Sequence, residues 1–92
     1  MSNPTATRTA VVASRVGLHA RPASLFVQAA AATGLPVTIA VGDGDAVDAR
    51  SILMVMGLGA QHGDQVTLTA EGEGAEAALD QLVTLVETDH DA

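Results

Sequence analysis

The chain has 92 residues, a formal net charge of −7, no cysteine and a single aromatic residue, a phenylalanine. This length predicts one domain over residues 1–92 with a core of modest size. The absence of cysteine excludes disulfide bonds and thiolate metal sites, and we expect a cytoplasmic protein. No segment has the pattern of a signal peptide or the length of a membrane span, so no membrane insertion is expected. The acidic charge and the single aromatic ring argue against nucleic acid as a partner.

The charges are divided unevenly along the chain. Residues 1–42 contain three of the four arginines and no acidic residue, whereas residues 43–92 contain all eleven acidic residues. Two interpretations are open. The acidic part can simply be a solvated surface, or a basic site on an acidic body can orient the protein towards an acidic partner or a phosphate.

The first third of the chain predicts a strand and then a helix. The segment from Thr5 to Ala13 is rich in threonine, valine and alanine, which is typical of a strand. The helix is expected from Ala20 to Thr33, because Gly34 and Pro36 together form a stop signal. Its buried face is expected to carry Phe26, Val27 and Ala30.

Two further strands and a short helix follow. Residues 37–41 alternate in polarity, Gly42-Asp43-Gly44 predicts a tight hairpin turn, and a short third strand is expected at residues 45–48. Ser51 is a natural N-cap for a short helix that ends near Gly57 or Gly59. Within this helix segment we expect two core residues, Val55 and Leu58.

The last third predicts one more strand and one more helix. Residues 65–70 alternate regularly between polar and apolar side chains, and a helix is expected from Ala75 to Thr88 with Gly74 as a weak cap. The apolar positions of this helix share one face: Ala78, Leu79, Leu82, Leu85 and Val86. The order βαββαβα predicts an α+β fold in which helices cover one face of a small antiparallel sheet.

The chemistry of the chain is concentrated in residues 17–23. A helix that begins beside His19 leaves its first backbone N–H groups, those of Ala20 and Arg21, without intrahelical partners, and these groups favour an anion. Arg21 adds a planar set of donors that suits phosphate oxygens, and Pro22 is tolerated in a first helical turn. Both positive features disfavour an imidazolium and leave His19 as a neutral nucleophile. The segment therefore predicts a phosphoryl acceptor, His19, with Arg21 as its clamp.

Groups that a catalyst would need are missing from the neighbourhood of His19 in the sequence. The nearest carboxylate along the chain is that of Asp43, and the sequence has neither a lysine-containing phosphate loop nor an acidic pair with magnesium-binding spacing beside His19. We therefore expect a stoichiometric intermediate and not an enzyme, with no cofactor and no metal. His62 and His90 have no such context and are expected to be solvated, and Arg15 is a less favoured candidate for a further contact with the site.

The run Gly17-Leu18-His19-Ala20-Arg21-Pro22-Ala23 resembles the active-centre motif of the HPr family, the histidine phosphocarriers of the bacterial phosphoenolpyruvate-dependent sugar phosphotransferase system. The segment from Ser51 to Gly59 is similar to the regulatory-serine helix of that family. The resemblance implies an open-faced β-sandwich, with three helices on one face of a four-stranded antiparallel sheet. It implies regulatory phosphorylation at Ser51 and a partner-docking surface that includes Ala23, Ile52, Leu53 and Met56.

The resemblance also implies a route for the phosphoryl group. His19 would receive it from phosphorylated enzyme I and pass it to an enzyme IIA domain during sugar uptake, and a serine kinase/phosphorylase would act on Ser51. We expect a monomer. Lysines that relatives carry around the docking face are replaced here by Gln28, Ala31 and Met54. Two alternatives stay open: a nitrogen-branch or regulatory paralogue that carries phosphate for signalling, and a binding-only regulator that acts through the Ser51 face.

Overall fold

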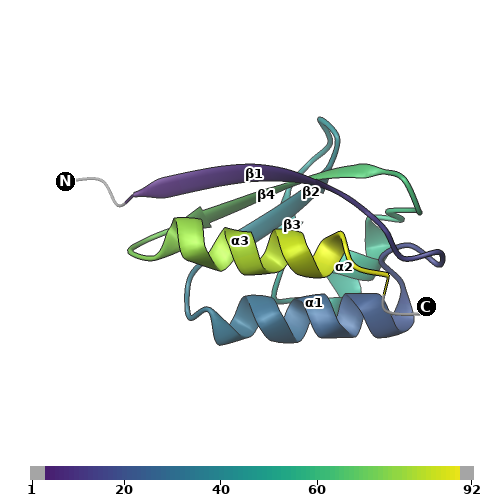
Figure 1. The fold of residues 1–92 in the computed structure, drawn as a ribbon, viewed down its shortest axis with the longest axis horizontal. Coiled ribbons are helices and arrows are strands. Elements are labelled where there is room, and N and C mark those ends of the chain that lie inside the picture. The colour runs from purple at the N-terminus through teal and green to yellow at the C-terminus, as the bar shows by residue number, and fades with distance from the viewer. Residues whose placement is uncertain (1–3, 90–92) are drawn as a thin grey trace.

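The structure is a computed structural model that describes residues 4–89. Its elements follow the predicted order: β1 (Thr5–Val11), α1 (Ala20–Ala32), β2 (Val37–Val41), β3 (Val47–Asp48), α2 (Ile52–Gly57), β4 (Gln65–Glu71) and α3 (Ala75–Val86). The strands form one antiparallel sheet in the order β1-β4-β2-β3, and the three helices lie together on one of its faces (Figure 1). The predicted fold class is confirmed.

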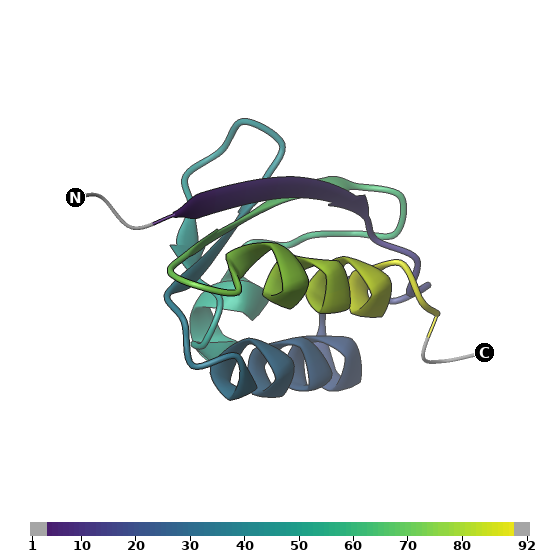
Figure 2. The same ribbon diagram turned by 60° about the vertical axis from the view of Figure 1, so that its left-hand side comes forward.

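The central strand β4 explains which face of the sheet is covered. Because successive side chains of a strand point to opposite faces, Val66, Leu68 and Ala70 all face the helices and are buried. Leu68 lies opposite Arg8 on β1 and Ile39 on β2, so the same register fixes the inner face of three strands. In the turned view the opposite face of the sheet carries no helix (Figure 2).

The core lies between this inner face and the two long helices. Its largest fully buried side chains are Phe26 from α1, Ile39 and Leu68 from the sheet, and Leu79 and Leu82 from α3. Burial of one such side chain stabilises the folded state by roughly 1.5–3 kcal/mol, so these contacts hold α1 and α3 against the sheet. The short α2 adds Val55, as predicted. Three other predicted core residues are half-buried at the margin: Val27, Leu58 and Leu85.

The first strand ends two residues earlier than predicted, at Val11. The backbone N–H groups of Val12 and Ala13 leave the sheet ladder and donate instead to the carbonyl oxygens of Asp64 (2.9 Å) and Val86 (3.1 Å). The sequence contains no sign of this change of partner, because both acceptors lie far along the chain. The segment that follows β1 is therefore held by two other parts of the molecule before it reaches α1.

Two other element ends also differ from the prediction. The third strand is reduced to Val47–Asp48, because residues 42–46 form a loop that is longer than a tight hairpin turn. A turn is present at its start, where the N–H of Gly44 donates to the carbonyl oxygen of Val41. The last helix ends at Val86 and not at Thr88. Within residues 4–89 no helix is both long and apolar enough to cross a membrane.

Candidate functional site

His19 is the N-cap residue of α1. Its backbone is extended (φ −130°, ψ 154°), and its side chain is exposed and makes no capping hydrogen bond to the helix. The first N–H groups of an α-helix have no intrahelical partners, and the side chain of this cap residue does not satisfy them. The predicted helix start beside His19 is confirmed, and the structure adds that the imidazole is exposed and does not cap the helix.

Ala20, the first residue of α1, has a φ of 43°. It is the one non-glycine residue in the described part of the chain with a positive φ. The left-handed region costs a residue with a Cβ roughly 1–2 kcal/mol, so the chain stores strain directly after the histidine. Nothing in the sequence predicted this strain, because alanine is an ordinary helix former.

The loop that carries His19 is held against the loop between α2 and β4. The N–H of Leu18 donates to the carbonyl oxygen of Ala60 (2.9 Å), and the N–H of Gly63 donates to that of Val12 (2.9 Å). Gly17, with a φ of 73°, lies so close to this second loop that an added Cβ would be 2.3 Å from the oxygen of Ala60. The glycine before His19 is therefore required both by its backbone angle and by the close approach.

The C-terminal end of α3 holds the same loop from another side. Besides the hydrogen bond from Ala13 to Val86, the carboxylate of Glu87 accepts from the backbone N–H of Val11 at 3.0 Å. The carboxylate of Asp89 lies 3.6 Å from Nε of Arg15. Along the chain the nearest carboxylate to His19 is that of Asp43, but the fold also brings the carboxylates of Glu87 and Asp89 to the segment that precedes His19.

Three of the four arginines have acidic partners. Arg8 binds Glu76 and Asp80 at 2.6 Å each, and these hydrogen bonds raise its pKa above the ordinary arginine value. Arg15 pairs with Asp89, and Arg50 pairs with Asp48. Most of the positive charge that the sequence places in residues 1–42 is therefore compensated by acidic residues from the second half of the chain.

Arg21 differs from the other three arginines. It is exposed, and within residues 4–89 its guanidinium makes no hydrogen bond or ion pair. It lies two residues after His19, in the first turn of α1. A guanidinium without a partner beside an exposed imidazole is free to bind an incoming anion.

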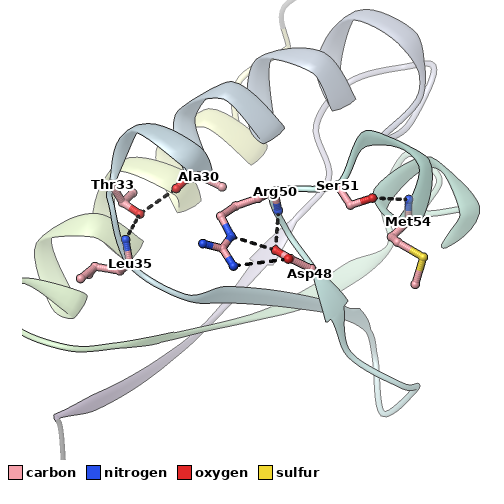
Figure 3. Close-up of polar contacts among 7 residues, drawn as sticks. All are labelled: Ala30, Thr33, Leu35, Asp48, Arg50, Ser51 and Met54. Atoms are coloured by element: carbon pink, nitrogen blue, oxygen red, sulfur yellow. Dashed lines mark hydrogen bonds and ion pairs between the residues drawn. The ribbon is translucent and has the colours of Figure 1, made fainter.

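Ser51 is the N-cap of α2, as predicted. Its hydroxyl accepts a hydrogen bond of 3.4 Å from the N–H of Met54 (Figure 3). Beside it, Nε of Arg50 donates to Asp48 at 3.1 Å and the backbone N–H of Arg50 donates to the same carboxylate at 2.9 Å. These hydrogen bonds lower the pKa of Asp48. Arg50 is thus held by a carboxylate in the present structure.

The start of α2 presents apolar side chains to solvent. Leu53 is 80% exposed, Met54 49% and Ile52 37%. The structure places Ile52 and Leu53 on the surface, as a docking role requires, and adds Met54 to them. Met56, the other residue of α2 predicted to take part in docking, is half-buried and packs against the core, so only part of its side chain lies on this surface.

The proposed docking role of Ala23 is wrong, because this residue is completely buried. The signal was present in the sequence. Ala23 lies three residues before Phe26, on the face of α1 that packs into the core. A contact between Ala23 and a partner is therefore excluded unless α1 moves.

His62 is exposed in the loop between α2 and β4, and His90 lies outside the described residues. Across residues 4–89, no group of three or more histidine, cysteine or acidic side chains is placed to bind a metal ion.

Comparisons with known proteins identify relatives of this chain. Residues 6–88 match the family model described as the PTS HPr component phosphorylation site. The phosphocarrier protein HPr of Streptomyces coelicolor is 63% identical over 70 residues, which are 76% of this chain and 75% of that protein. The phosphocarrier protein HPr of Haloferax volcanii is 48% identical over 82 residues, 88% of this chain and 92% of that protein.

The fold is also that of solved HPr structures. The crystal structure of a phosphocarrier protein HPr from Bacillus anthracis superposes with a TM-score of 0.85 at 39% sequence identity, covering 91% of this chain and 99% of that one. On this scaffold His19 is exposed at an uncapped helix start, beside an arginine that has no ionic partner in the described part of the chain. The chain therefore belongs to the HPr family of phosphocarrier proteins of the phosphotransferase system.

Proposed function

We propose that this protein accepts a phosphoryl group on His19 from phosphorylated enzyme I and passes it to an enzyme IIA domain during phosphoenolpyruvate-dependent sugar uptake. It acts as a stoichiometric carrier, and its partners supply the catalysis. The observation that carries the proposal is the exposed imidazole of His19 at the uncapped start of α1, followed by Arg21, which has no ionic partner within residues 4–89.

The transfer exchanges one nitrogen–phosphorus bond for another. A neutral ring nitrogen of His19, Nδ1 in our proposal, attacks the phosphorus atom of the phosphohistidine on enzyme I. The bond from that phosphorus to the donor histidine breaks, and the donor ring leaves with the electron pair. Such a reaction depends mainly on positioning and on stabilisation of the phosphoryl oxygens.

The backbone N–H groups of Ala20 and Arg21, together with the Arg21 guanidinium, hold the transferred group. A helix end contributes about 0.3–1 kcal/mol to the binding of an anion. A charge-assisted hydrogen bond adds about 1.5–3 kcal/mol. Contributions of this size retain the phosphoryl group without trapping it, which is what a carrier between two proteins requires.

Partner docking is assigned to the exposed apolar side chains of α2. Ile52, Leu53 and Met54 offer a contact surface without lysines, and methionine adapts to partners of different shape. Ser51 stands at the edge of this surface, so its phosphorylation by a serine kinase/phosphorylase would add about two negative charges beside apolar contacts. We propose that this modification weakens docking and that the carrier acts as a monomer.

The test is phosphorylation by enzyme I and phosphoenolpyruvate, read as an acid-labile mass gain of one phosphoryl group. Wild type and His62→Ala should be phosphorylated, and His19→Ala should not. His62→Ala is the matched control, because it also removes an exposed imidazole. Phosphorylation of His19→Ala, or none of wild type, would reject the proposal.

Transfer of the phosphoryl group from His19 to different enzyme IIA proteins distinguishes between the proposed function and its alternatives. Phosphoryl transfer from this protein to a sugar-specific enzyme IIA supports a role in sugar uptake, and transfer only to a nitrogen-branch enzyme IIA identifies a regulatory paralogue. Binding to a partner through the Ser51 face without phosphorylation of His19 identifies a binding-only regulator.

A further inference from the structure

A second arginine lies on the loop that carries His19. Arg15 is four residues before the histidine, and its side chain is 81% exposed. The N–H of Gly17 donates to the carbonyl oxygen of Ser14 at 3.0 Å, which makes Arg15 and Val16 the two corner residues of a turn. Four residues span at most about 14 Å when extended, and the turn shortens that span. A phosphoryl group on His19 would therefore lie in the neighbourhood of Arg15.

Arg15 is paired with Asp89, which follows the last helix. The C-terminal end of α3 and the N-terminal end of α1 lie at the same end of the molecule (Figure 1). The distance of 3.6 Å between Nε of Arg15 and the Asp89 carboxylate is long for a charge-assisted hydrogen bond, and the arginine is mostly in solvent. The Asp89 side chain is 22% exposed, so the solvent reaches this pair mainly from the side of the arginine. A pair with a long contact and one partner in solvent is weak, so a stronger anion can draw Arg15 away from Asp89.

A phosphoryl group on His19 is such an anion. It carries up to about two negative charges and three acceptor oxygens, whereas Asp89 carries one charge. From the turn, the ion pair and the exposure of the side chain, we propose that Arg15 is a second phosphoryl-binding residue, which leaves Asp89 for the phosphoryl group when His19 is phosphorylated. The inference rests on the proposed function only in requiring that His19 carries the group. It assigns to Asp89 the role of a competing anion.

The experiment loads His19 with phosphoramidate, which needs no partner protein. A ring nitrogen of His19 forms a bond to phosphorus while the bond from phosphorus to the amide nitrogen breaks and ammonia leaves. The second ionisation of the bound phosphoryl group is then followed by ³¹P NMR as the pH is changed. A guanidinium close to the group favours the dianion and lowers the midpoint of this titration.

Four proteins give a double-mutant cycle: wild type, Arg15→Gln, Asp89→Asn and the double variant. Arg15→Gln should raise the midpoint by about 0.3–0.7 pH unit, which is a twofold to fivefold change typical of an exposed ion pair. Asp89→Asn should lower the midpoint, because it frees Arg15. The double variant should titrate like Arg15→Gln, and Arg15→Lys should recover part of the shift because the charge is kept.

Glu87→Gln is the matched control for charge. It removes one negative charge from the same end of α3, but its carboxylate contacts the backbone of Val11 and no arginine. Its effect on the midpoint should be smaller than that of Asp89→Asn and should be the same with or without Arg15. The proposal is overturned if Arg15→Gln leaves the midpoint unchanged, or if Asp89→Asn has its full effect in the absence of Arg15.

A second measurement follows the arginine directly. The Nε–H resonance of Arg15 should move when His19 is phosphorylated, whereas that of Arg8, held by two carboxylates, should not. The same variants are also loaded with enzyme I. Loading by phosphoramidate but not by enzyme I, with the Arg15 effect present, rejects the proposed function and keeps this inference. If enzyme I phosphorylates the protein but the Arg15 variants show no effect, the proposed function is kept and this inference is rejected. If neither phosphoramidate nor enzyme I phosphorylates His19, both are rejected.

Discussion

Gly17 and Ala60 are packed so closely that a Cβ on Gly17 would lie 2.3 Å from the carbonyl oxygen of Ala60. The same oxygen accepts the hydrogen bond from the N–H of Leu18, the residue directly before His19. Gly17→Ala must therefore displace one of the two loops. We expect a loss of about 3 kcal/mol of unfolding free energy, from the left-handed backbone angle and from overpacking together.

Gly34→Ala is the control for this substitution. Gly34 has nearly the same φ, 72°, but an added Cβ there meets nothing within 4 Å. It should lose only about 1 kcal/mol, the cost of the backbone angle. Urea denaturation of both variants measures the difference, and equal losses would show that the contact with Ala60 has no energetic weight.

Arg21→Gln should slow phosphoryl uptake from enzyme I by roughly tenfold to hundredfold, because one charge-assisted hydrogen bond to the phosphoryl group is lost. Its stability should be unchanged, since within residues 4–89 the Arg21 guanidinium has no partner to lose. The measurement is kcat/KM of enzyme I with each variant as the substrate. Arg50→Gln removes the same charge from the start of α2 and should have a smaller effect. If Arg21→Gln and Arg50→Gln lowered kcat/KM equally, Arg21 would contribute only a general electrostatic attraction to enzyme I and no specific contact with the phosphoryl group.

Ser51→Asp should weaken uptake from enzyme I through its negative charge. Aspartate is as good an N-cap as serine, so α2 should keep its stability. Ser51→Asn is the control, because asparagine also caps a helix but carries no charge. We expect a raised KM for the aspartate variant alone. Unchanged kinetics in Ser51→Asp would remove the regulatory role proposed for this residue.

The pair of Asp48 and Arg50 predicts a pH dependence. The hydrogen bonds from Arg50 lower the pKa of Asp48 in the folded protein, so the ionised carboxylate favours the folded state. This contribution is present above the unfolded pKa of aspartate and is lost as the pH falls through the lower, folded pKa. In Arg50→Gln the titration midpoint of the Asp48 carboxyl, followed by NMR, should move upward towards the ordinary value. Arg8→Gln should leave this midpoint in place, and an unmoved midpoint in Arg50→Gln would contradict the assignment.

Much of the fold follows from local signals. The stop formed by Gly34 and Pro36 placed the end of α1 within one residue, because glycine at positive φ ends helices by a rule that needs no tertiary contact. Alternating polarity placed β2 and β4, because the side chains of a strand alternate between the two faces of the sheet wherever the strand lies. This signal needs no tertiary contact either. The prediction failed at the end of β1, where distant carbonyl groups decide the hydrogen bonds.

The candidate site divides in the same way. The sequence placed His19 at a helix start, and the structure confirms this position. It named Arg21 as the clamp of a phosphoryl group, which stays a prediction, but it could not indicate that Arg21 has no ionic partner among the described residues. It gave a wrong role to Ala23, although the spacing from Phe26 already indicated burial, and it could not indicate the strain at Ala20.

By itself, the sequence determined the order of the elements and the helix that begins beside His19, because these depend on neighbours within a few residues. Only the tertiary structure decided which charges meet. Asp89 reaches Arg15, and Glu76 and Asp80 reach Arg8, because the sheet order and the packing of α3 on β1 bring together residues that are far apart along the chain. Local propensities do not encode such distances, and for that reason the basic appearance of residues 1–42 in the sequence is reduced to one unpaired arginine among the described residues.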